Sequence, residues 1–88
     1  MQRSGMYVLY RDVNVVRDGL VVPDPKQRQY FATLDRRERY DQDGNPITST
    51  LGAAATLSKQ GAFEHALDKP GWAVGELIST ADGLRVEE

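Results

Sequence analysis

Three Asp-Gly steps divide this chain: Asp18-Gly19, Asp43-Gly44 and Asp82-Gly83. Residues that favour extended structure flank each step, among them Val13 to Val16 before the first. Asp-Gly suits the central pair of a tight hairpin turn, because glycine takes a positive φ at no steric cost and aspartate tolerates it. The sequence therefore predicts short antiparallel strands joined by tight turns.

The expected fold class is α+β, with antiparallel β-hairpins of about five or six short strands packed against one broken helical segment. Arg11-Asp12 interrupts the first extended stretch, as a bulge or a short turn does. Pro23 and Pro25 are expected to end the first hairpin, because proline cannot donate to a sheet ladder. The expected strands are residues 6–10, 13–17, 20–22, 47–50, 72–78 and 84–86.

The segment Lys26 to Tyr40 leaves two interpretations open. As a strand, it places Tyr30, Ala32 and Leu34 on one face, and Asp43-Gly44 turns it back towards Ile47. As a helix, it has Asp24 as its N-cap and Pro25 in its first turn. Residue types favour the helix and the turn chemistry favours the strand, which is the prediction adopted.

A helical segment is predicted between Leu51 and Leu67, with Ser49 or Thr50 as its cap. One continuous helix does not give a single apolar stripe, so a break is expected at Lys59-Gln60-Gly61. The second piece then turns Phe63, Ala66 and Leu67 inward, and Pro70 stops it by Asp68 or Lys69.

Eighty-eight residues predict a single domain over 1–88, with residues 1–5 and 87–88 as loose tails. The chain has no cysteine, which removes disulfides, thiolate nucleophiles and Cys-based metal sites. Its apolar runs are too short for a membrane span or a signal peptide. A cytoplasmic protein that does not contact the membrane is the expectation.

Charge is unevenly distributed along the chain, whose net charge is −2. Residues 1–40 hold eight basic and five acidic side chains, while residues 41–88 hold three and eight. An arginine-rich segment, 26–40, includes interleaved aromatics, a combination that can bind phosphates and stack on bases. The sequence pI near 5.3 is far from the basic character of a nucleic-acid domain. A solvated face with local ion pairs is the alternative.

No catalytic, cofactor or metal residues are predicted. His65, next to Glu64 and three residues before Asp68, lacks an accompanying nucleophile motif and fits a solvated helical histidine. Residues 41–45 alternate oxygen ligands, but Pro46 takes the place of the calcium-loop glycine. The string 40–47 resembles one YD-type repeat of large secreted shell proteins. That resemblance covers eight residues once and implies hairpin chemistry only.

Trp72 is expected in the core or as a hairpin anchor, with an interface role as the alternative. By subtraction, the predicted function is a small non-catalytic binding module that acts through a protein–protein interface, suited to an accessory or inhibitory protein of phage or plasmid type. The alternative is a nucleic-acid-binding module that uses segment 26–40, and strand edges offer a route to a homodimer. The candidate partner-binding residues are Arg28, Tyr30, Arg36, Arg37, Arg39, Tyr40 and Trp72.

Overall fold

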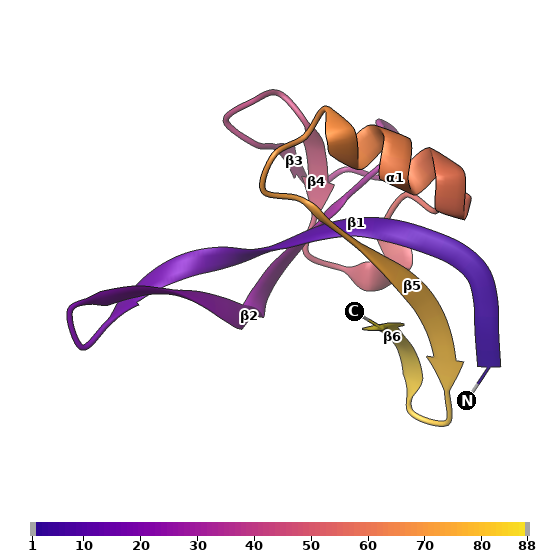
Figure 1. Ribbon diagram of the computed structural model, residues 1–88, viewed down its shortest axis with the longest axis horizontal. Coiled ribbons are helices and arrows are strands. Elements are labelled where there is room, and N and C mark those ends of the chain that lie inside the picture. Colours follow the sequence, from indigo (N-terminus) through magenta and orange to yellow (C-terminus); the bar gives the residue numbers. More distant parts are fainter. Residues whose placement is uncertain (1, 88) are drawn as a thin grey trace.

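The computed structural model describes residues 2–87 and shows one six-stranded antiparallel sheet in the order β3-β4-β2-β1-β5-β6 (Figure 1). The expected α+β class is confirmed in outline, although the sheet takes the larger share. No helix within the described residues is long and apolar enough to cross a membrane. The elements are β1 Gln2–Arg17, β2 Leu20–Phe31, β3 Arg39–Tyr40, β4 Pro46–Thr48, the 3-10 helix η1 Leu51–Ala53, α1 Lys59–Leu67, β5 Ala73–Thr80 and β6 Gly83–Glu87.

The first Asp-Gly step behaves as predicted. Arg17 pairs with Leu20 across it, and both Asp18 (φ 52°) and Gly19 (φ 79°) adopt the positive φ of a type I′ turn. Asp43-Gly44 also lies in the turn between β3 and β4. At the third step Thr80 pairs with Gly83, so the two central residues are Ala81 and Asp82 rather than Asp82 and Gly83.

The prediction that Pro23 and Pro25 end the first hairpin is wrong. Strand β2 continues through both prolines to Phe31. It tolerates them because β4 pairs with β2 only at Tyr30 and Phe31, so the outer edge of the preceding residues needs no ladder donor. Arg11-Asp12 does not interrupt β1 as predicted, and the expected strands 6–10 and 13–17 are one strand; the register does shift between Asp12 and Val13, but the extra residues lie on β2.

Segment 26–40 contains no helix, so its prediction as a strand is right in type but not in extent. Strand β2 ends at Phe31, Leu34 lies in a turn, and β3 resumes only at Arg39. The structure also brings the expected tails into strands. Strand β1 begins at Gln2, and Arg3 forms ion pairs with Glu76 and with Glu87 of β6. Residues 1 and 88 lie outside the described part.

The helical segment differs from its prediction. Residues 54–57 are extended, because their backbone groups bond to the sheet: Leu57 exchanges two hydrogen bonds of 2.8 Å with Tyr7, and Ala55 donates to Phe31. Gly61 does not break the helix but lies in its first turn, where its N–H donates to the Ser58 hydroxyl at 3.1 Å.

Of the three helix residues predicted to face inward, only Ala66 does so. Ala62 is fully buried and Ala66 packs against the core, while Phe63 and Leu67 are exposed. The small alanines let the helix lie close to β1 and β5. The core itself is built from Leu9, Ile47 and Trp72, with the partly buried Phe31, Leu57, Ala66 and Val74 around it.

The β1–β2 hairpin projects from this body as a long two-stranded arm (Figure 1). We call residues 11–28 the arm. Its side towards β5 is open because β5 pairs with β1 only as far as Tyr10. Its other side is open because β4 reaches only Tyr30 and Phe31.

Candidate binding surface

The structure places Trp72 in the core, as its first interpretation predicted. Its exposed fraction is 8%, and the ring of Phe31 meets it edge-on at 6.0 Å. The guanidinium of Arg11 stacks on its open side, 4.5 Å from the ring centre. Trp72 therefore stabilises the body and offers little surface to a partner.

Arg28 is occupied by contacts within the chain. Its Nε and Nη2 atoms donate to both carboxylate oxygens of Asp12, at 2.7 and 3.1 Å, and its guanidinium lies 4.4 Å above the ring of Tyr10. Tyr30 is half-buried nearby. Burial raises the pKa of the Tyr30 hydroxyl, as does the charge of Asp12, against the opposing charge of Arg28.

The other candidate arginines lie on the segment that leads from β2 to β4, Arg36 and Arg37 in its loop and Arg39 in β3. Arg36 donates to the carbonyl oxygen of Gly52 at 3.4 Å, Arg37 lies over the ring of Tyr40, and Arg39 lies 3.9 Å from Glu38. All are exposed, as is Tyr40.

Acidic side chains accompany these arginines. Residues 33–45 hold three arginines but four acids, Asp35, Glu38, Asp41 and Asp43, which gives a net charge of −1. Hydrogen bonds from Ser49 lower the pKa of Glu38, so this carboxylate stays charged beside Arg39. The loop therefore presents a mixed rather than a basic surface.

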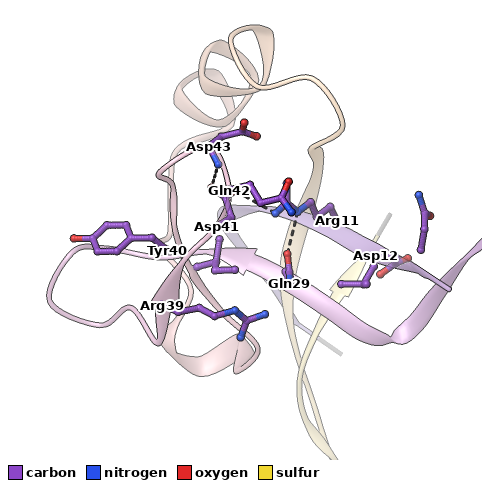
Figure 2. Close-up of a pocket in the computed structure, with 11 residues that line it drawn as sticks. Arg11, Asp12, Gln29, Arg39, Tyr40, Asp41, Gln42 and Asp43 are labelled. Carbon is purple, nitrogen blue, oxygen red and sulfur yellow. Dashed lines mark hydrogen bonds and ion pairs between the residues drawn. The ribbon is translucent and has the colours of Figure 1, made fainter.

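A groove of about 600 Å³ lies between this loop and the base of the arm (Figure 2). Two of its polar side chains, Asp41 and Arg11, are engaged by their neighbours. Asp41 accepts hydrogen bonds from the backbone N–H groups of Asp43 and Asn45, from the Asn45 amide, and from Arg11. Arg11 also donates to Gln29 at 3.0 Å.

This network orders the turn and leaves Asp41 no free acceptor for a ligand. Burial opposes ionisation of Asp41, but the hydrogen bonds and the charge of Arg11 outweigh it and lower the pKa of its carboxyl. Within residues 2–87 no three His, Asp or Glu side chains gather as metal ligands would. His65 is exposed on α1, with its ring 6.1 Å from that of Phe31.

The surface that sequence reasoning missed is the apolar side of the arm. Val16 and Val21 form a cross-strand pair near its tip and are 71% and 69% exposed. Asn14 and Pro23, the next pair on the same side, are exposed as well, and Leu20 is exposed at the turn. The sequence held a weak signal for this surface. Apolar residues lie on both faces of the strands that flank Asp18-Gly19, and a hairpin of two strands cannot bury both faces.

The opposite side of the arm carries the half-buried Val13, Val15 and Val22 together with Asp24. Asp24 is buried there and accepts hydrogen bonds from Arg17, from the backbone of Lys26 and from Gln27. These contacts hold the irregular part of β2 in place. Both sides of the arm thus carry valines, but the side with Val16 and Val21 is the more exposed one, because contacts around Asp24 partly cover the other.

Comparison with known proteins gives no relative from which a role could be transferred: no protein-family model, curated protein or solved structure matches the chain.

Proposed function

We propose that this chain is a small non-catalytic binding module that acts through a protein–protein interface, and that the apolar side of the arm is its contact surface. The single observation that carries the proposal is the exposed Val16–Val21 pair on a projecting hairpin. Exposed apolar groups that gather on one feature mark interaction sites more often than scattered ones do.

The build of the arm supports this role. An isolated two-stranded hairpin is only marginally stable in water. Here the type I′ turn and the ion pairs Arg17–Asp24 and Arg28–Asp12 hold the hairpin in one shape before any partner arrives. A preorganised surface loses less conformational entropy on binding.

The alternative, a nucleic-acid-binding module, has less support. Of its arginines, Arg28 is engaged by Asp12, and Arg36, Arg37 and Arg39 lie among acids that outnumber them. Polyanion binding needs a basic footprint. The chain's size and its lack of cysteine suit a cytoplasmic accessory or inhibitory protein of phage or plasmid type, which is an argument by analogy.

The test is a pull-down from the native host with partners identified by mass spectrometry. The double variant Val16→Thr with Val21→Thr keeps β-branched side chains but removes two apolar methyl groups. Binding should weaken about tenfold or more, because each loss of about 1.4 kcal/mol of apolar burial lowers the affinity tenfold. Leu67→Gln is the matched control, because Leu67 is 84% exposed on α1 away from the arm.

Partners that the wild type and the Leu67→Gln variant retain should be lost from the double valine variant. Equal capture by all three proteins would refute the arm as the contact surface. Arg36→Ala with Arg37→Ala tests the alternative: retention on immobilised DNA that falls with this change, and falls with salt, would favour nucleic acid instead.

A further inference from the structure

The two outer edges of the arm are chemically different. Arg17 and Leu20 close a two-residue type I′ turn, so their backbone groups exchange hydrogen bonds with each other. Antiparallel pairs alternate, so the pair Val15–Val22 is also hydrogen-bonded, and the pairs Val16–Val21 and Asn14–Pro23 are not. The N–H and C=O groups of these last four residues, where present, point outward.

Pro23 has no N–H, and it occupies an outward position of β2. Beyond it the register of β2 is broken by the bulge that contains Pro25. The β2 edge is therefore a poor template for another strand, as proline-bearing edges are in general. On β1 the outward residues Asn14 and Val16 each offer both a donor and an acceptor.

We infer that the β1 edge of the arm, residues 13–17, binds an extended segment of another protein as an added strand. This inference rests on the proposed function and specifies its mode: main-chain hydrogen bonds to Asn14 and Val16 supply affinity, and side chains of the added strand extend the apolar side formed by Val16 and Val21.

Charge determines the chemistry of the segment that fits. The edge Val13-Asn14-Val15-Val16 carries no charge. The charged residues that flank it on β1 are one of each sign, Asp12 and Arg17, which lie 2.7 Å from Arg28 and 3.3 Å from Asp24. An uncharged segment rich in β-branched residues therefore matches this edge better than an acidic or basic one.

A second copy of this chain fits the same edge poorly. Antiparallel self-pairing centred on Asn14 sets Arg11 opposite Arg17 of the other copy, and pairing centred on Val15 sets Asp12 opposite Asp18. Like charges directly opposite destabilise a sheet. Moving the centre to Val13, or closer to the turn, shortens the paired segment to five residues or fewer, because β1 is already paired with β5 up to Tyr10. The occupant that the edge favours is thus a different chain.

The probe is a synthetic peptide of alternating valine and threonine, added to the isotope-labelled full chain at millimolar concentration. Amide hydrogen exchange at Asn14 and Val16 should slow by at least about tenfold on binding, while the already bonded amide of Val15 should change little. The inference would be overturned if exchange slowed at Val21 but not at Asn14 and Val16, or if it slowed at none of the three.

Asn14→Pro removes one outward donor and copies what β2 already tolerates at Pro23, the residue opposite. It should abolish peptide binding, whereas Asn14→Thr, which keeps the N–H, should preserve it. Preserved turn resonances of Asp18 and Gly19 would show that the arm is intact. Peptide binding that survives Asn14→Pro would contradict strand addition, and sedimentation that shows a dimer lost in this variant would replace the occupant with a second copy.

Failure of this mode is distinguishable from failure of the proposed function. A native partner that is lost with Val16→Thr and Val21→Thr but retained with Asn14→Pro would leave the arm as the binding surface and exclude the added strand. A partner retained by all variants would refute both.

Discussion

Gly75 is the position where one added methyl group should disturb the body most. It is buried in β5 and pairs with Val8 of β1. A Cβ atom on Gly75 would lie 2.2 Å from Cγ1 of Val86, 3.0 Å from Cε1 of Tyr10 and 3.2 Å from the carbonyl oxygen of Glu87. The first distance is far inside van der Waals contact, so Gly75→Ala forces Val86 or its strand to move.

The magnitude follows from two opposing effects. Overpacking of a well-packed core costs about 1–3 kcal/mol. Replacing glycine with alanine restricts the unfolded chain and returns about 0.4–1 kcal/mol. We therefore expect Gly75→Ala to lower the free energy of unfolding by about 1–2 kcal/mol, which corresponds to a fall in Tm of several degrees for a domain of this size.

Urea denaturation at constant m-value measures this loss as a lower midpoint concentration. Gly52→Ala is the control, since a Cβ on Gly52 meets no atom within 4 Å and its φ is not positive; it should be neutral or slightly stabilising. Val86→Ala removes the clashing methyl group, so the two changes together should cost less than their sum. A Gly75→Ala protein as stable as the wild type, or additive behaviour of the pair, would refute the reasoning.

Two further outcomes are expected. Pro23→Val restores an outward N–H on the second edge of the arm and should increase self-association, measured by sedimentation over a concentration series; an unchanged mass would mean that Pro23 does not block this edge. Because the pKa of Asp41 is lowered in the fold, its stabilising effect is full above its ordinary value near 3.8 and is lost as pH falls through the folded value. Asp41→Asn should therefore flatten the acid side of the stability profile, and an equally steep profile would contradict this.

The turns were predictable from the sequence because their chemistry is local. Asp18-Gly19 needs two positive φ values, and few residue pairs supply them as readily. The third step was placed one residue late, since Thr80 rather than Ala81 closes that turn. Local rules identify a hairpin but do not fix its register to the residue.

The helical segment was mispredicted because tertiary contacts override its local preferences. Residues 54–57 carry helix-forming alanines, yet their backbone hydrogen bonds to Tyr7 and Phe31 hold them extended. Large apolar residues were expected to face inward, but the sheet accepts the smaller Ala62 and Ala66 and leaves Phe63 exposed. Which face of a short helix packs depends on the space available, which the sequence of the helix does not encode.

The candidate site, too, was predicted correctly in one part and wrongly in another. Trp72 was correctly expected in the core because its area matters to any small domain. The arginines of 26–40 were grouped because they are close in sequence. In the fold, Arg28 forms an ion pair with Asp12 on the arm, while Arg36 and Arg37 lie on a separate loop. Pairing across strands cannot be seen in a list of neighbours along the chain.

The prolines of β2 link the error in fold prediction to the proposed function. A proline inside a strand was interpreted as its end, because a ladder needs every donor. That rule applies only to a strand paired on both sides, and residues 20–28 are paired on one. Pro23 has no N–H group, which is why the sequence predicted the end of a strand there. The same absence makes the β2 edge of the arm a poor template for another strand, whereas the β1 edge keeps the outward N–H groups of Asn14 and Val16. Under the proposed function, this departure from strand chemistry leaves one edge of the hairpin for recognition, in keeping with the expectation that departures from local rules occur at functional sites.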